Sequence, residues 1–237
     1  LMDQLREVSL HAKSFTWQIV IADNASSDKT WELARILACK FPFTLRAIRI
    51  PQKGRGRALK IAWGTSKARV RAYMDVDLST DIRQIPELVG PILDGRADVC
   101  FGSRLLPASR VERCAKREFI SRSYNRMLQS YLGVHFHDAQ CGFKAISAEA
   151  ADTLLPLIQD NEWFFDTELL VLAERMGIAS CEFAVRWKED PGTTVHIVDT
   201  VRKDLAGMKR LKASEGQAGS SQPDTYRYPL KQAADVR

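Results

Sequence analysis

Asp75 and Asp77 stand one residue apart where the apolar segment 70–74 ends. At the carboxyl end of a parallel strand, such side chains project into the crevice where open α/β sheets bind ligands. Two close carboxylates repel each other unless a cation separates them, and Mg²⁺ or Mn²⁺ accepts one or two carboxylates together with phosphate oxygens. The pair therefore predicts a metal–diphosphate site, and the alternative is a polar strand end at which Asp77 or Ser79 caps the next helix.

A second polar turn follows the apolar segment 19–22 and begins with Asp23. A carboxylate at a strand end can accept a hydrogen bond from a nucleotide base, and the helix that follows offers free backbone N–H groups. The alternative is an ordinary α/β turn with capping residues. The loop 53–57, which contains Arg55 and Gly56, could likewise cradle phosphate or only turn the chain.

Basic residues crowd one part of the sequence: Arg104, Arg110, Arg113, Lys116, Arg117, Arg122 and Arg126, among which Glu112 and Glu118 are the only acids. The segment does not show the series of stacking aromatic residues that a single-strand nucleic-acid site would need, so the net charge of +6 does not indicate nucleic acid. Either a solvated helix face or a phosphate site explains it.

Alternation of β-branched apolar runs with helical periodicity predicts an α/β fold with a largely parallel sheet. We expect strands over 17–22, 44–50, 70–74, 98–102, 143–146 and 180–185. Helices are expected over 1–10, 30–40, 57–66, 118–132 and 166–176, with another opened by Pro86. The composition fits one domain over residues 1–211, and the polar, glycine- and serine-rich residues 212–237 predict a flexible tail.

The five cysteines are scattered and show no C-x-x-C spacing, which disfavours a disulfide framework or a structural zinc and indicates a reducing compartment such as the cytosol. The sequence has no apolar run of the roughly 20 residues that a membrane span requires. It does not specify an oligomeric state.

Six short segments occur in a fixed order: 23–30, 54–59, 75–79, 102–104, 138–144 and 163–168. Of these, Gln-Cys-Gly-Phe-Lys at 140–144 is nearly distinctive. The ordered set, spread over residues 17–195, resembles the family-2 polyprenyl-phosphate glycosyltransferases, that is, dolichyl-phosphate glucosyltransferase and dolichol-phosphate mannose synthase. The resemblance implies a GT-A fold, with a Rossmann-like, mostly parallel sheet flanked by helices. It also implies inverting transfer of a hexose from a nucleotide diphosphate to a polyprenyl phosphate at the cytoplasmic face of a membrane.

The resemblance also implies roles. The donor would be bound by Asp23, Asn24, Ser26, Asp28, Arg55, Gly56, Asp75 and Val76, and the metal by Asp75, Asp77 and Ser79. The catalytic residues would be Asp77, Arg104, Arg117, Asp138 and Gln140. The acceptor side would consist of Lys144, Trp163, Asp166 and Glu168, although the last two could instead be first-turn acids of a helix.

The sequence departs from the family in several places. It begins after the family's first strand and its Pro-x-x-Asn-Glu signature, so we expect a domain without that strand. Asn24 replaces a usual acid and Lys29 a usual glycine. Membrane contact would fall to a basic surface or to an apolar stripe in 200–211, for which packing in the core is the other explanation.

The 140–144 segment favours UDP-glucose as donor over GDP-mannose. Two other classes remain open. Asp75 could be the nucleophile of a haloacid-dehalogenase-type phosphatase, although no second acidic metal motif follows it. The second class is a non-catalytic protein that binds a nucleotide-sugar.

Overall fold

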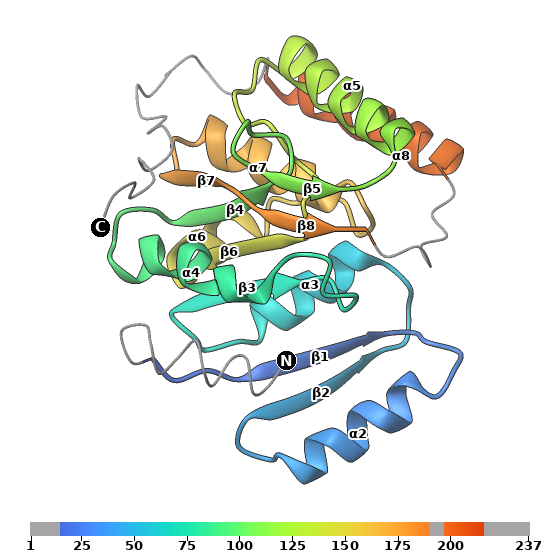
Figure 1. Cartoon of the computed structure of the whole chain (residues 1–237), viewed down its shortest axis with the longest axis vertical. Helices are drawn as coiled ribbons and strands as arrows, with labels where there is room; N and C mark the ends of the chain where they lie inside the picture. The colour runs from blue at the N-terminus through green and yellow to red at the C-terminus, as the bar shows by residue number, and fades with distance from the viewer. Residues whose placement is uncertain (1–14, 190–196, 216–237) are drawn as a thin grey trace.

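The computed structural model describes residues 15–189 and 197–215, which form an α/β structure (Figure 1). The helix expected over 1–10 and most of the expected tail lie outside these residues. Strands β1 (Ile19–Asn24) and β2 (Leu45–Ile50) pair in parallel and are joined by α2 (Thr30–Lys40). Helix α3 (Arg55–Gly64) then packs against β1 and leads to β3 (Val70–Met74).

A four-stranded sheet with the order β3-β6-β4-β7 forms the centre of the molecule. It contains β4 (Val99–Ser103), β6 (Phe143–Ser147) and β7 (Ser180–Ala184). Strand β6 runs antiparallel to both β3 and β4, whereas β7 is parallel to β4. Three of the four strands therefore share one direction, and the largely parallel sheet that the sequence predicts contains one reversed strand, β6.

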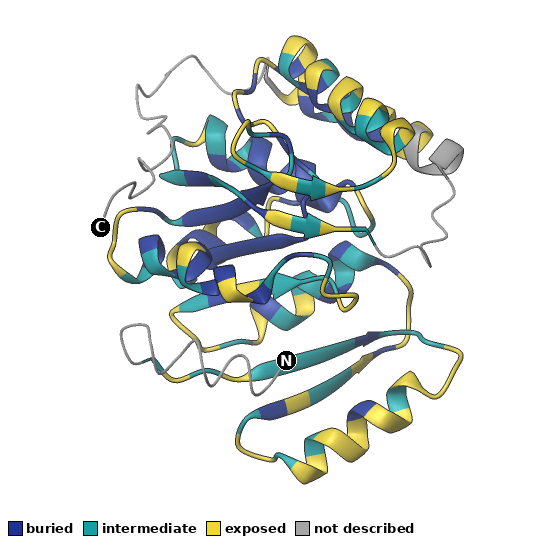
Figure 2. Ribbon diagram, in the orientation of Figure 1, coloured by how far each residue is buried: buried dark blue, intermediate teal, exposed yellow. Residues whose placement is uncertain are grey.

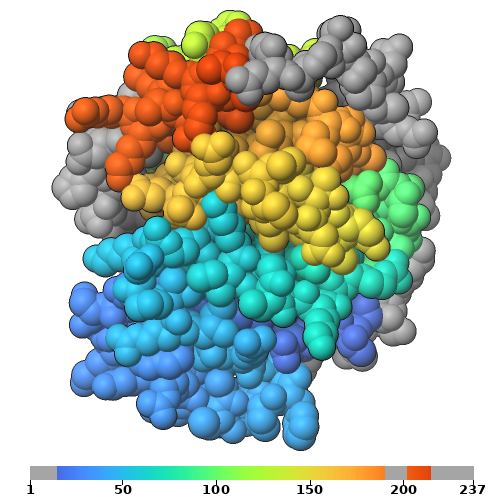
Figure 3. All heavy atoms as spheres, turned by 180° about the vertical axis from the view of Figure 1, so that it is seen from behind, coloured from blue at the N-terminus to red at the C-terminus, as the bar shows by residue number. Residues whose placement is uncertain are grey.

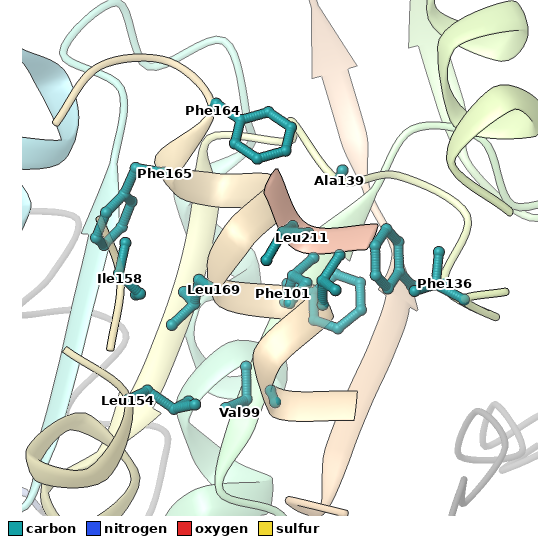
Figure 4. Close-up of a cluster of buried hydrophobic side chains, with 14 of the residues drawn as sticks. Val99, Phe101, Phe136, Ala139, Leu154, Ile158, Phe164, Phe165, Leu169 and Leu211 are labelled. Atoms are coloured by element: carbon teal, nitrogen blue, oxygen red, sulfur yellow. The ribbon is translucent and has the colours of Figure 1, made fainter. Parts of the chain in front are cut away.

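Both faces of this sheet are covered, which explains why β4 is buried along its whole length. Val99 and Phe101 point to one side, into a cluster with α5 (Ala115–Leu132), α6 (Ala148–Leu154), α7 (Phe165–Arg175) and α8 (Ile197–Glu215) (Figure 4). Cys100 points to the other side, toward α4 (Ile85–Leu93), which follows the short helix η1 (Ile82–Gln84). The alternation of side chains along a strand thus produces two cores.

A third, two-stranded parallel sheet consists of β5 (Arg110–Glu112) and β8 (Arg186–Lys188). In the described part of the chain, strand pairing does not connect the β1–β2, central and β5–β8 sheets. The β1–β2–α2 unit and the α5–α8 pair lie at opposite ends of the molecule in the views from both sides (Figures 1 and 3).

The sequence-based boundaries agree closely with the structure for α2 and β3, and differ elsewhere in two instructive ways. Helix α3 begins two residues earlier than predicted because the loop 161–162 caps it. Helix α8 continues to Glu215, so residues 212–215 belong to a helix and not to the predicted tail.

Candidate active site

Asp75 is held in place at the carboxyl end of β3. Its backbone N–H donates to the carbonyl of Gly142, and its own carbonyl accepts from Leu78 in a tight turn, where Leu78 adopts a φ of 53°. The carboxylate lies 3.0 Å from the guanidinium of Arg55. Asp77, two residues on, is exposed and accepts a hydrogen bond from the backbone of Ser79. One carboxylate of the pair is therefore anchored by protein and the other faces outward.

Gly142 is required by the closeness of the neighbouring loop. A Cβ atom at this position would lie 1.9 Å from a carboxylate oxygen of Asp75, which is far inside van der Waals contact. The distinctive 140–144 segment thus has a steric reason for its glycine: it lets the loop 138–142 pack directly against the carboxylate.

Arg55 joins two carboxylates across the site. Its guanidinium lies 3.0 Å from Asp75 and 3.4 Å from Asp166, and it lies over the rings of Tyr73 and Trp163 at 5.3 and 5.0 Å. Burial raises the pKa of Asp75; Arg55 opposes that rise, while Asp166 and Asp77 add to it. The charged form of Asp75 is therefore destabilised in the absence of a further positive charge.

The structure corrects the predicted backbone cradle at Gly56. The N–H groups of Gly56 and Arg57 already donate to the carbonyls of Glu162 and Asn161, at 3.1 and 2.9 Å. A Cβ on Gly56 would also meet Phe165 at 2.6 Å. Gly56 therefore allows α3 to pack against α7, and only the side chain of Arg55 from this loop reaches the site.

The structure also corrects the assignment of Lys144 to the acceptor side, because its side chain is fully buried beneath the site. Its ammonium group lies 2.9 Å from Asp166, and it donates to the carbonyls of Ala139 and Cys141 at 2.9 and 2.7 Å. These contacts use the three N–H donors of a lysine. Lys144 thus holds the loop 139–141 from below and does not face an acceptor.

Asp166 completes this buried network. The hydroxyl of Tyr73 donates a hydrogen bond to the carboxylate of Asp166. The guanidinium of Arg55 donates a hydrogen bond to the same hydroxyl. Burial alone would raise the pKa of Asp166, but Lys144 and Arg55 hold it below the usual value. Asp166 is thus a charged carboxylate that lies between the cations Lys144 and Arg55.

Asp138 and Arg104 form a clamp at the other side of the loop. Two guanidinium nitrogens of Arg104 donate to the two oxygens of Asp138 at 2.8 and 2.9 Å, and the backbone N–H of Arg104 adds a third bond of 2.9 Å. Burial would raise the pKa of Asp138, and the charge and hydrogen bonds of Arg104 keep it low. The bidentate geometry fixes the guanidinium, which also lies 5.6 Å over the ring of Trp187.

Two other predicted residues anchor helices. Gln140 donates to Asp204 of α8 at 3.2 Å, and Glu168 accepts from the backbone of Asp160 and from Arg210 at 2.8 and 2.9 Å. Glu168 is buried in the first turn of α7, so its contacts are those of a structural first-turn acid. Trp163 differs, because its ring is 43 % exposed beside Arg55.

The end of β1 carries buried polar atoms without a protein partner. Neither carboxylate oxygen of Asp23 has a hydrogen-bond partner in the described residues, although Arg49 lies 3.7 Å away. The amide oxygen of Asn24 also has no hydrogen-bond partner in the described residues. An unsatisfied buried acceptor is costly, so a ligand with N–H donors fits this turn. Ser26 is half-buried there, and the carboxylate of Asp28 accepts from the backbone N–H of Thr30, the first residue of α2, at 3.0 Å.

Metal ligands are few in the described part of the chain, which contains no cluster of three or more His, Cys, Asp or Glu side chains suited to a cation. Asp75 and Asp77 provide two carboxylates, and the hydroxyl of Ser79 is buried without a partner. This donor set fits a hard cation that takes its remaining ligands from a diphosphate. Val76, between them, is almost fully exposed.

Arg117 lies apart from this cluster, in the first turn of α5, where it pairs with Glu189. Contacts in the structure therefore bring together Asp75, Arg55, Trp163, Asp166 and Lys144, and the loop 138–142 adds the Asp138–Arg104 clamp. The turn at Asp23 and Arg117 are on separate elements.

Sequence reasoning missed two functional candidates. Tyr73 precedes Asp75 by two residues and therefore points to the same side of β3, a signal that could have identified it. Asp204, the partner of Gln140, lies in the segment 200–211, where only the apolar stripe was considered. In the structure Met208 and Leu211 of that stripe belong to the core, as the packing alternative predicted, while Leu205 is exposed and Val201 lies among the side chains that are not described.

Comparison with known proteins identifies the family of this chain. Residues 3–155 match glycosyl transferase family 2, and the chain belongs to that family. It is 36 % identical over 192 residues to glycosyltransferase AglD of Haloferax volcanii, covering 81 % of this chain and 30 % of that protein. It is 33 % identical over 183 residues to dolichyl-phosphate β-glucosyltransferase ALG5C of Trichomonas vaginalis, covering 74 % of this chain and 54 % of that one.

Solved structures show the same fold. The chain resembles glucosyl-3-phosphoglycerate synthase of Mycobacterium tuberculosis in its UDP complex, with a TM-score of 0.65 and 19 % identity over 89 % of this chain and 75 % of that one. The complex of the same enzyme with Mn²⁺, UDP-glucose and glycerol 3-phosphate has a TM-score of 0.57 and 18 % identity, covering 92 % and 76 %.

The expected GT-A fold is thereby confirmed, and membership of family 2 removes the phosphatase alternative. The chain spans between about a third and two thirds of the length of the curated relatives it matches. None of the helices in the described part of the chain combines the length and apolarity that crossing a bilayer requires.

Proposed function

We propose that this chain is the catalytic domain of an inverting, metal-dependent glycosyltransferase that moves glucose from UDP-glucose to a polyprenyl phosphate. The observation that carries the proposal is the end of β3, where Asp75 is fixed by Arg55 and packed against Gly142 while Asp77 points outward. The relatives named as dolichyl-phosphate β-glucosyltransferases supply the donor sugar and the acceptor class.

For the donor, the uridine ring would meet the unsatisfied acceptors of Asp23 and Asn24. Asp75 and Asp77 would hold Mg²⁺ or Mn²⁺, with the orphaned hydroxyl of Ser79 beside them. The cation would supply charge stabilisation for the departing diphosphate. Arg55 lies next to the same carboxylate and contributes a fixed positive charge at that point.

For the acceptor, a strong general base is unnecessary. A phosphate monoester has a second pKa near 6, so at neutral pH it is largely a dianion and is itself the nucleophile. Asp138 would not serve as a base, because Arg104 occupies both of its oxygens and lowers its pKa. Its role would be to hold Arg104 toward a phosphate, with Arg117 as a second cation on the acceptor side.

Attack in line with the leaving diphosphate would invert the anomeric carbon. The chain's contribution is then positioning: Trp163 and the loop 138–142, supported by Lys144 and Asp166, would shape the sugar side of the site. A polyprenyl phosphate resides in a bilayer, so the domain would act as a peripheral protein at the cytoplasmic face of a membrane.

The experiment is transfer of labelled sugar to a short polyprenyl phosphate from UDP-glucose and from GDP-mannose, with and without Mn²⁺ or Mg²⁺. We expect product from UDP-glucose that depends on the metal. Product from GDP-mannose alone would replace the donor assignment with the mannosyl alternative. Binding of UDP and Mn²⁺ without transfer from either donor would instead identify a non-catalytic binder.

A further inference from the structure

The outer layer formed by α5 and α8 carries much of the chain's positive charge. Over their full lengths, residues 115–132 and 197–215, the two helices contain nine basic and four acidic side chains. Their net charge of +5 accounts for most of the +6 of the whole chain. The two helices pack against each other at one end of the domain (Figure 1).

The basic side chains of this layer point outward. Seven of the nine are exposed: Lys116, Arg122, Arg126, Arg202, Lys203, Lys209 and Lys212. Of the acids whose side chains are described, Glu118 is half-buried and is already shared by Arg113 and Arg122, and Asp204 is buried in the interface with Gln140. Among the described residues, neither Lys116 nor Arg126 forms an ion pair, so no described acid neutralises its charge.

An exposed aromatic ring lies at the centre of this basic face. Phe119 is 72 % exposed, and helical spacing places it on the same side of α5 as Lys116, Arg122 and Arg126, opposite the buried Leu128. The outer side of α5 is exposed along its length (Figure 2). Leu205 of α8 is also 40 % exposed. Exposed Lys and Arg side chains are attracted to anionic lipid, and an apolar ring among them gains by leaving water for the headgroup region, so this face fits an anionic lipid surface.

The same helices are tied to the acceptor side of the site. From α8, Asp204 accepts from Gln140, and Arg210 donates to Glu168. From α5, Asn125 accepts from the backbone N–H of Ala139 at 2.9 Å, next to Gln140. A partner that binds the outer side of α5 and α8 is therefore separated from the loop 138–142 only by these two helices.

We propose that the outward face of α5 and α8, centred on Phe119, docks on the surface of a bilayer that contains anionic phospholipid. The charge provides attraction, and Phe119 provides insertion at the headgroup level. Docking of this face deepens the proposed function, because it would bring the acceptor side of the site to the lipid; its test does not require sugar transfer.

The test is co-sedimentation of the full chain with phosphatidylcholine vesicles and with vesicles in which part of the lipid is phosphatidylglycerol, at low and at physiological salt. The double variant Lys116→Gln/Arg126→Gln removes two unpaired charges. At about 1 kcal/mol per basic residue near an anionic surface, it should weaken binding to the anionic vesicles roughly 30-fold. Phe119→Ser should weaken it roughly tenfold, and this loss should persist at high salt.

The matched control is Arg35→Gln/Arg46→Gln, which removes the same charge from exposed positions of α2 and β2 at the opposite end of the molecule. Its binding should stay within about twofold of the parent if the face, and not net charge, is responsible. Equal losses in both double variants would overturn the proposal. A second outcome would also overturn the proposal: RNA that competes with the vesicles, binds more tightly than they do and depends in the same way on Lys116 and Arg126. That outcome would identify the face as a nucleic-acid surface.

A transfer assay separates this proposal from the proposed function. With polyprenyl phosphate embedded in anionic vesicles, Lys116→Gln/Arg126→Gln should lose activity, and with a short water-soluble acceptor it should keep the parent rate. A parent that binds anionic vesicles but transfers no sugar would contradict only the proposed function. A parent that transfers sugar but binds neutral and anionic vesicles equally would contradict only the docking face.

Discussion

Asp204 offers a quantitative test of how α8 is attached to the site. Its side chain is only 3 % exposed, and its carboxylate accepts a hydrogen bond from Gln140. Burial raises the pKa of Asp204 from 3.8 to about 6, against the opposing hydrogen bonds of Tyr124 and Gln140. The folded protein therefore binds this proton more tightly than the unfolded chain does.

The sign of the effect follows from that difference. Between about pH 4 and pH 6 the folded state holds more protons than the unfolded state, so the contribution of Asp204 to the free energy of unfolding falls as the pH rises. At neutral pH the charged carboxylate costs about 3 kcal/mol relative to its neutral form, since a tenfold change in acidity corresponds to about 1.4 kcal/mol. Asp204→Asn keeps the shape and an acceptor for Gln140 but removes the charge.

We expect Asp204→Asn to raise the free energy of unfolding by up to about 3 kcal/mol at pH 7 and to change it little at pH 4. Urea unfolding at several pH values measures this, with constant slopes as the check that only stability has changed. Glu149→Gln, at an exposed position, is the control and should show no comparable pH-dependent gain. A variant that is less stable than the parent at pH 7, or a gain of equal size at both pH values, would refute the reasoning.

Three further substitutions test the site. Asp77→Asn should abolish turnover while leaving circular dichroism and melting temperature unchanged, because the residue is exposed; near-normal rates with added Mn²⁺ would defeat its assignment. Gly142→Ala should raise the donor KM at least about tenfold, since its Cβ would displace the carboxylate of Asp75, and an unchanged donor KM would show that this contact is irrelevant to the donor. Arg117→Ala should mainly raise the acceptor KM, and an acceptor KM and kcat equal to the parent's would remove Arg117 from the phosphate site.

Local signals made much of the fold predictable. Helix α2 and strand β3 were predicted to the residue because each is bounded by turn residues and has a single clear periodicity. The pair β5 and β8 was missed because three-residue strands have no periodicity of their own. Its parallel register, with Arg110 opposite Arg186, depends on tertiary placement. The reversal of β6 is likewise a property of the sheet and not of its sequence.

The pairing of charged residues within the site could not be predicted from the sequence. The sequence identifies residue types that can bind metal or phosphate, and it does not show which of them neutralise one another. Lys144 and Asp166 were predicted on the acceptor side, with a first-turn acid of a helix as the alternative for Asp166. In the structure they form a buried ion pair, and Asp166 lies in the first turn of α7. Arg104 and Asp138 were both predicted, yet their bidentate clamp, which disfavours Asp138 as a base, follows only from the geometry.

The central claim is that the carboxylates at the end of β3 hold the donor diphosphate through a divalent cation. Calorimetric titration of UDP into the full chain, with and without Mn²⁺, tests it most directly for the parent and for Asp77→Asn. The account predicts that Mn²⁺ tightens UDP binding at least about tenfold in the parent and has little effect in the variant. UDP affinity that is indifferent to Mn²⁺ in the parent, or a Mn²⁺ effect that survives Asp77→Asn, would contradict it.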